Sequence, residues 1–322
     1  MSVYKIGRNS KKKVTLVGIN TLIKVYILIM MKITQAFLYL TIGFLFSCSS
    51  PQNKKNNEEK QVITVSILPL QTFIEEIAGN DFEINVLLPP GASPADFTLV
   101  PSQLKNIARS EIWFRIGYIG FEYSWRDKIE QANRNMKVVN LSEGLDLISD
   151  EHLPSGEKSS TGGINPHTWL SPSLVKQMAG SITNELILLN PGKKSKYQAN
   201  LEQFVEKIDE LDAEIRTVLK DFEGRRFIMF HPSLSYFARE YGLIQYSLEP
   251  GGKEPTPHRM AALVDFAKKE NIGVIYIQSD LDRSQARVFA EEINGKVVQM
   301  WPLNPEWFEN LREITESLAS HL

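Results

Sequence analysis

Apolar residues along most of this chain follow two alternating patterns, short unbroken runs and positions at helical spacing. Each run predicts a buried strand, and each helix-spaced segment predicts a helix packed beside it. The predicted strands are Val62–Leu68, Glu83–Leu88, Glu111–Gly117, Lys137–Leu141, Arg226–Phe230, Leu243–Leu248, Gly273–Gln278 and Lys296–Met300. The predicted helices are Thr72–Ala78, Ser102–Ser110, Leu234–Tyr241, Arg259–Glu270, Arg283–Ile293 and Trp307–Ser320. This alternation indicates an α/β fold with two lobes, each holding a parallel four-stranded sheet.

A longer helical pattern lies between the two halves. Its apolar residues are spaced alternately three and four apart, which places them on one face: Leu201, Phe204, Ile208, Leu211, Ile215, Val218 and Phe222. A helix over residues 193–222 would be roughly 45 Å long and would join the lobes as one rigid rod. The alternative is a free coiled coil. We therefore predict an N-terminal lobe (62–192), a linking helix (193–222) and a C-terminal lobe (223–322).

The first 61 residues show the pattern of a targeting segment. Met31 and Lys32 precede an apolar run from Ala36 to Phe46, then Ser47 and Cys48, which predicts a signal peptide over 31–47. Residues 45–48 resemble a bacterial lipobox, so we expect a lipid on Cys48 that attaches the protein to a membrane of the cell envelope. Residues 48–61 would then form a flexible tether. Residues 1–30 are then a long leader or a misassigned start. The alternative is a transmembrane anchor over residues 25–46, and both place the lobes outside the cytoplasm.

Composition narrows the function classes further. A formal net charge of −2 over 322 residues argues against nucleic acid as a partner. Cys48 is the single cysteine, so neither an intramolecular disulfide nor a cysteine-based zinc site can form. We found no activated serine, glycine-rich phosphate loop or cofactor fingerprint in the sequence, and we do not expect an enzyme. We expect a monomer.

Candidate ligand-binding residues follow the ends of predicted strands. In open parallel sheets, ligands bind outside the carboxyl ends of the strands. The proline-rich loop Pro89–Asp96, His231 and Trp301 each follow such a strand, and His167 lies in the segment Asn165–Pro172. We expect these positions to converge in the cleft between the lobes.

Taken together, these segments resemble the zinc/manganese ABC-transporter solute-binding proteins. The matching stretches are Leu88–Pro94, Pro101–Ser102, Leu141–Gly144, Asn165–Pro172, Phe230–His231, Tyr236–Ala238 and Glu254–Pro257. The resemblance covers residues 62–322 in order. It implies two α/β lobes on a rigid helix, a divalent metal as cargo in the interlobe cleft, and delivery to an importer made of a permease and an ATPase.

The resemblance also assigns metal ligands residue by residue. His167 and His231 occupy two of the four ligand positions, whereas Ala95 and Trp301 occupy the others and cannot coordinate a cation. Imidazole rather than carboxylate at His231 favours zinc over manganese. Further candidate ligands, in the cleft loops or near strand ends, are Asp96, His152, Glu254, Asp280 and Asp282.

Several alternatives stay open. His167 and His231 could be structural histidines held in packed loops, while we expect His258 on the surface and His321 at a frayed C-terminus. The cleft could instead take a non-metal small solute against Trp301. The chain could also be a surface adhesin or a structural lipoprotein that kept the fold.

Overall fold

A computed structural model of the chain describes residues 21–35, 60–92, 97–149, 163–249, 255–278 and 283–322. Residues 60–322 form one compact unit, and residues 1–59 form another, of which only a helix at 21–35 is described. Among the described residues, no helix is both long enough and apolar enough to cross a membrane. The apolar run of the predicted signal peptide, Cys48 and almost all of the tether lie outside the described residues.

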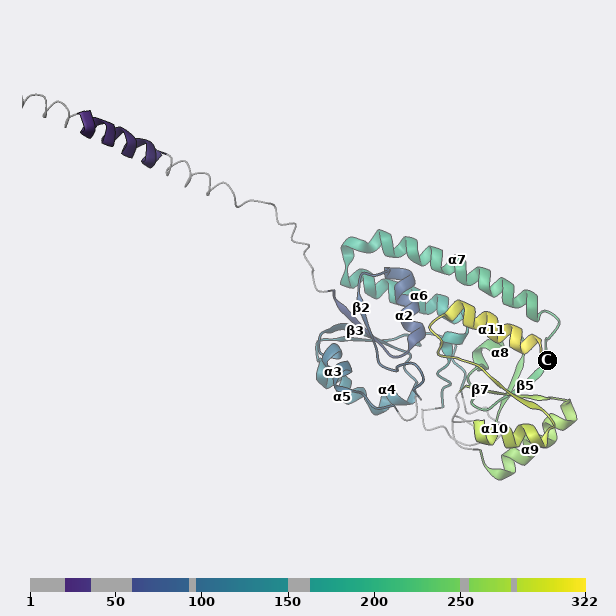
Figure 1. Ribbon diagram of the computed structural model, residues 1–322. Coiled ribbons are helices and arrows are strands. Elements are labelled where there is room, and N and C mark those ends of the chain that lie inside the picture. Colours follow the sequence, from purple (N-terminus) through teal and green to yellow (C-terminus); the bar gives the residue numbers. More distant parts are fainter. Residues whose placement is uncertain (1–20, 36–59, 93–96, 150–162, 250–254, 279–282) are drawn as a thin grey trace, which may run out of the picture. The chain divides into compact units, whose positions relative to one another are not determined.

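Two parallel four-stranded sheets form the framework of the compact unit, which confirms the predicted fold class (Figure 1). The N-terminal sheet has the order β2-β1-β3-β4, and its strands are β1 (Val62–Val65), β2 (Glu83–Val86), β3 (Ser110–Arg115) and β4 (Lys137–Asn140). The C-terminal sheet has the equivalent order β6-β5-β7-β8, and its strands are β5 (Arg226–Met229), β6 (Ile244–Ser247), β7 (Val274–Ile277) and β8 (Lys296–Gln299). The two halves therefore repeat one topology.

Helices follow the strands in both halves. In the N-terminal half they are α2 (Leu68–Ala78), α3 (Pro101–Ile107), α4 (Gly120–Ser124) and α5 (Arg126–Ala132). In the C-terminal half they are α8 (Ser235–Glu240), α9 (Pro257–Glu270), α10 (Arg283–Glu292) and α11 (Trp307–Ala319). Helix α2 begins earlier than the predicted start at Thr72 because Pro69 fits the first turn, where its fixed φ is already helical.

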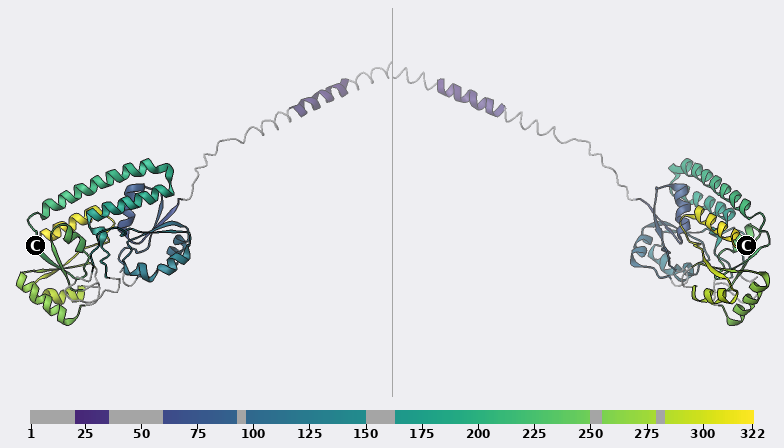
Figure 2. Two further views of the ribbon diagram at one scale, coloured as in Figure 1. Left: turned by 180° about the vertical axis from the view of Figure 1, so that it is seen from behind. Right: turned by 45° about the vertical axis from the view of Figure 1, so that its right-hand side comes forward.

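One long linking helix joins the halves, as in the predicted fold class, and a second long helix, which we did not predict, packs beside it. Helix α6 (Pro172–Leu189) leads through a 3₁₀ turn, Pro191–Lys193, into α7 (Lys194–Leu219), which packs along it. Figures 1 and 2 show the two helices lying side by side, and α7 also packs against α2 and α11. At 1.5 Å per residue α7 is roughly 39 Å long. Because α7 is covered by helices of both halves, its apolar stripe is not that of a free coiled coil.

The stripe on α7 differs from the predicted one in its last turn. Phe204, Ile208, Leu211 and Ile215 are buried, but Val218 is 42% exposed and Leu219 is buried in its place. The helical period of 3.6 residues shifts the buried face by about one position over this length. The helix ends at Leu219, three residues before the predicted end.

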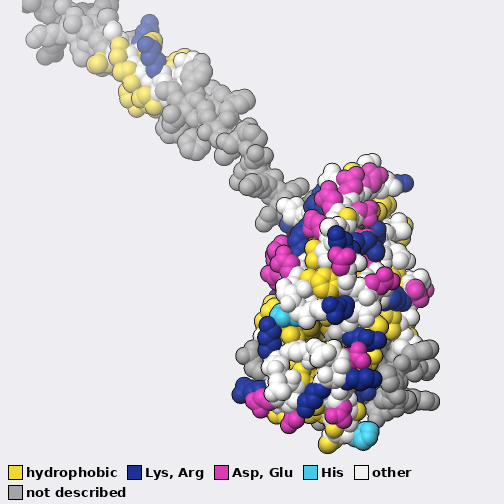
Figure 3. Space-filling model, turned by 90° about the vertical axis from the view of Figure 1, so that its right-hand side faces the viewer, with side chains coloured by type: hydrophobic (Ala, Val, Ile, Leu, Met, Phe, Trp, Pro, Cys, Tyr) yellow, Lys and Arg dark blue, Asp and Glu magenta, His cyan; other side chains and the backbone are white. Residues whose placement is uncertain are grey.

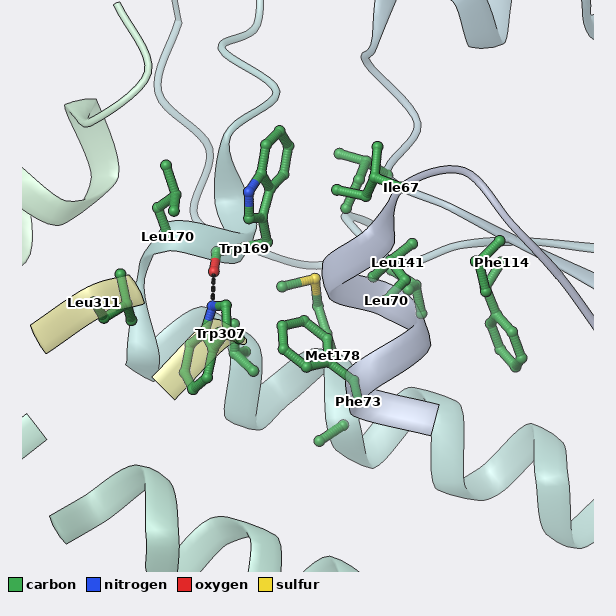
Figure 4. Packing of buried hydrophobic residues seen from close by; sticks show 14 of the residues in the cluster. Ile67, Leu70, Phe73, Phe114, Leu141, Trp169, Leu170, Met178, Trp307 and Leu311 are labelled. Atoms are coloured by element: carbon green, nitrogen blue, oxygen red, sulfur yellow. Dashed lines mark hydrogen bonds between the residues drawn. The ribbon is translucent and has the colours of Figure 1, made fainter. Parts of the chain in front are cut away.

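The hydrophobic core is continuous through both halves. Side chains alternate along β5, so that Phe227 and Met229 face this shared core while Ile228 and Phe230 face a smaller cluster on the opposite side of the sheet. Trp307 of α11 lies edge-on to Phe73 of α2, with ring centroids 5.3 Å apart (Figure 4). Helix α11 therefore contributes to the core that packs against α2 of the N-terminal half. The exact lobe boundaries, 62–192, 193–222 and 223–322, stay a prediction.

Candidate metal-binding site

Two histidines from different halves of the chain meet where the halves join. His167 directly precedes the 3₁₀ turn η2 (Thr168–Leu170), and His231 follows β5. Their ring centroids are 5.1 Å apart and the rings are inclined at 71°. Two imidazoles bound to one tetrahedral zinc, with Zn–N bonds of about 2.0–2.1 Å, would have their centroids about 5 Å apart. The observed spacing therefore suits a shared metal ion.

His167 is buried, with 7% of its surface exposed. Its Nδ1 lies 2.9 Å from Asn165 Oδ1, the same oxygen that accepts a hydrogen bond from the His167 backbone N–H at 3.0 Å. Trp169 covers the ring, with centroids 5.0 Å apart. Burial, and secondly the charge that His231 would carry, hold the pKa of His167 well below its usual value. The ring is therefore neutral at neutral pH, which is the form that binds metals.

His231 is paired with a carboxylate that sequence reasoning missed. Its Nδ1 lies 2.8 Å from Oε2 of Glu249, and both side chains are largely buried. Glu249 stands just beyond the carboxyl end of β6, so the strand-end rule that selected His231 and Trp301 would also have selected it. Arg259 holds this strand end, since its Nε donates to the carbonyl of Leu248 and its Nη2 to that of Ser247, at 2.9 and 2.7 Å.

Trp301 is connected to the histidine pair through Pro302, the next residue in the chain. The indole Nε1 of Trp169 donates to the carbonyl of Pro302 at 2.7 Å, and Trp169 is the residue that covers His167. The Trp301 side chain itself is 51% exposed. Trp301, which the resemblance assigns to a ligand position, therefore follows β8 and presents an apolar surface to solvent.

The other candidate ligands are four carboxylates and one histidine. Within the described ranges, no group of three or more His, Cys, Asp or Glu side chains is arranged to hold a metal ion. The predicted positions that lie outside the described residues are Ala95, Asp96, His152, Glu254, Asp280 and Asp282. Their participation stays a prediction.

The two remaining histidines lie in the first turn of α9 and just after α11. His258, in the first turn of α9, is exposed, as predicted. The prediction of a frayed end at His321 was wrong. Its Nδ1 lies 2.6 Å from the carbonyl oxygen of Ser317, and its ring lies 6.2 Å from that of Tyr276, so the turn after α11 is packed against the sheet.

The low pKa of His167 predicts a pH-dependent stability of the metal-free protein. Unfolding exposes the ring to water, where it takes up a proton below about pH 6.5, whereas the folded protein does not. The free energy of unfolding should therefore fall as the pH drops below that value, by up to ~1.4 kcal/mol per pH unit from this group.

Urea unfolding of the wild type and of His167→Gln, measured from about pH 8 to about pH 5, checks this prediction. The variant should lose less stability over the acidic part of the range. Curves that stay parallel would show that the pKa of His167 is the same in the folded and unfolded states.

The geometry described so far defines a class of protein, a two-lobed α/β binding protein with a pair of imidazoles at the interlobe joint. Residues 63–321 match the family described as zinc-uptake complex component A, periplasmic. The chain belongs to this family, which confirms the resemblance to the zinc/manganese ABC-transporter solute-binding proteins.

Individual relatives agree with this assignment. The high-affinity zinc uptake system protein ZnuA of Bacillus subtilis is 27% identical over 270 residues, which cover 80% of this chain and 83% of the relative. A crystal structure of ZnuA superimposes with a TM-score of 0.75 at 33% identity, covering 82% of this chain and 99% of that one. The laminin-binding protein Lmb of Streptococcus agalactiae, described as having adhesin and metal-transporting activity, has a TM-score of 0.70 at 22% identity, with 82% and 99% coverage. This last likeness shows the fold alone.

Proposed function

We propose that this protein captures a divalent transition metal, zinc in preference to manganese, between His167 and His231 and delivers it to an ABC importer. The observation that carries the proposal is the pair of imidazoles 5.1 Å apart, each with Nδ1 already hydrogen-bonded and with Nε2 unpaired among the described residues. Membership of a zinc-uptake family supports it. The protein acts as a binding component rather than as an enzyme.

Zinc is favoured because both protein ligands are nitrogen atoms. Imidazole suits zinc, whereas manganese prefers carboxylate, carbonyl and water oxygen. Water molecules and one carboxylate or imidazole from Asp96, His152, Glu254, Asp280 or Asp282 would complete the coordination. Calorimetric titration of the metal-stripped protein should show zinc binding, weaker than at a site with four protein ligands, and weaker still for manganese. Absence of a zinc signal, together with no metal in the purified protein, would contradict the proposal.

The partners follow from this role. A permease would receive the metal from the two-lobed unit, and an ATPase would drive its passage through the membrane. The protein acts as a monomer held to the membrane of the cell envelope by its lipid, outside the cytoplasm. Genes for a permease and an ATPase next to the gene for this chain would favour import over adhesion.

Lipidation of Cys48 is open to a direct test. Cells fed labelled palmitate should yield labelled wild-type protein that partitions into detergent, because acyl chains contribute about 0.8 kcal/mol per buried CH₂ to membrane binding. The Cys48→Ala variant should carry no label. Labelling that persists in the variant would remove the lipobox assignment.

A non-metal solute is the second candidate cargo. The half-exposed indole of Trp301, at a position that the resemblance assigns to a ligand, offers a flat apolar surface to such a solute. If zinc fails to bind and solute binding depends on Trp301, this second function replaces the first.

A further inference from the structure

We propose that Asn165 and Glu249 are positioning residues, which hold both imidazoles with the proton on Nδ1 and the lone pair of Nε2 free for the metal. The inference deepens the proposed function and rests on it for its effect on metal binding. The assignment of the protons stands on the hydrogen bonds of the protein alone.

The orientation of the Asn165 side chain is fixed by groups of the C-terminal half. Its Nδ2 lies 2.9 Å from the carbonyl oxygen of Pro232 and 3.1 Å from Oγ of Ser235. A backbone carbonyl can only accept, so the amide group of Asn165 must face it. The Oδ1 atom then faces His167, and since an amide oxygen has no proton to donate, His167 Nδ1 must carry the proton of their 2.9 Å hydrogen bond.

A neighbouring set of hydrogen bonds supports the same orientation. The backbone N–H of Leu234 donates to Oε1 of Gln245 at 2.8 Å, so the amide nitrogen of Gln245 must donate to Ser235 Oγ at 2.9 Å. The hydroxyl of Ser235 in turn donates to the carbonyl of Pro232 at 3.3 Å. Ser235 Oγ is therefore available to accept from Asn165, and no donor in this network faces another donor.

Glu249 plays the equivalent role for His231. A carboxylate only accepts hydrogen bonds, so the proton of the 2.8 Å contact belongs to His231 Nδ1. The backbone N–H of Glu249 donates to the carbonyl of Phe230, the residue before His231, at 2.9 Å. The carboxylate is thus tied to the chain that carries its imidazole.

Asn165 connects the orientation of His167 to the chain segment that carries His231. Asn165 orients His167 while it is anchored to Pro232, the residue directly after His231. Neither ring then needs to change tautomer when a metal arrives, and the ordering of the ligands precedes binding. Groups in this position around metal-binding histidines typically change metal affinity about 10- to 100-fold when they are removed.

The experiment measures the histidine tautomers directly in the metal-free protein. The full chain, purified in detergent with ¹⁵N-labelled histidine, is compared at mildly alkaline pH with Glu249→Ala, Glu249→Gln and Asn165→Ala. Wild type should show both rings protonated on Nδ1. Glu249→Ala should release His231 into a mixture of tautomers and leave His167 unchanged, and Asn165→Ala should do the reverse. Glu249→Gln keeps an oxygen acceptor and should retain the wild-type tautomer.

Zinc titration of the same proteins gives the second measurement. Glu249→Ala should bind zinc about 10- to 100-fold more weakly, Glu249→Gln should stay close to wild type, and Glu313→Ala, an exposed glutamate on α11, should have no effect. Wild-type rings protonated on Nε2, or alanine variants with unchanged tautomers, would overturn the assignment. Tautomers as assigned in a protein that binds no zinc would instead remove the proposed function. If Asn165→Ala does not fold, the two Glu249 variants still decide the matter.

Discussion

Replacing either His167 or His231 by alanine should abolish zinc binding by the metal-stripped protein. With two imidazoles as the identified protein ligands, each substitution removes half of the set and leaves the ion held by one side chain, water and loop carboxylates. Calorimetry measures this loss, with metal content of the purified variants as a cross-check. Affinity in the wild type should also fall with acidification, because imidazole must be neutral to bind.

His258→Ala is the matched control for this experiment. Its imidazole is exposed on α9, and the variant should bind zinc like the wild type. Ala95→His should tighten binding, since the resemblance assigns a metal-ligand position to residue 95. If both histidine variants bind zinc as the wild type does, the two rings are structural and the metal site lies elsewhere.

Truncation of Trp307 to alanine should lower the free energy of unfolding by about 3–5 kcal/mol. The indole is 1% exposed, lies against Phe73 and Phe308, and donates from Nε1 to the carbonyl of Trp169 at 2.7 Å (Figure 4). Its removal leaves a cavity and an unpaired buried carbonyl in the joint between the halves. Urea unfolding at neutral pH, followed by circular dichroism, measures the change.

Trp301→Ala provides the same substitution at a half-exposed position. Because 51% of the Trp301 side chain already faces solvent, this variant should differ from wild type by less than about 0.5 kcal/mol. If Trp307→Ala loses as little stability as Trp301→Ala, the shared core does not depend on α11.

The two sheets were predictable from sequence because their strands are short apolar runs between helices. Helix α6 was missed, although it carries a recognisable start: Ser171 accepts a hydrogen bond from Leu174 N at its N-terminus, and Pro172 follows. The apolar positions after them, Leu174, Val175, Met178, Ala179, Ile182 and Leu186, have helical spacing and are all buried. This apolar spacing was sufficient to predict a helix. The prolines on both sides of His167 instead favoured a loop there.

The identity of two site residues was predictable, but their geometry was not. His167 and His231 were found from the resemblance, whereas their 5.1 Å approach depends on contacts between distant parts of the chain, such as the one from Trp169 to Pro302. No local pattern encodes such contacts. Glu249 directly follows the predicted strand Leu243–Leu248, so the same strand-end rule that selected His231 could have found it.

Charged side chains on the face shown in Figure 3 are arranged with both signs interspersed, in keeping with a net charge of −2. Ion pairs such as Lys196–Asp81 and Lys207–Glu76 connect α7 to the loop after α2 and to α2 itself, with lysine side chains that are about half-exposed. Exposed pairs of this kind contribute little stability, so the joint depends chiefly on its apolar core.

The position of Trp307 near the end of the chain constrains the order in which the protein can be made. The first sheet and α2 are synthesised early, but the core above Phe73 stays open until α11 has left the ribosome. A nascent chain stopped before residue 307 therefore exposes the apolar face that Trp307 would cover. The packing around Phe73 in the N-terminal half is therefore complete only once α11 is in place.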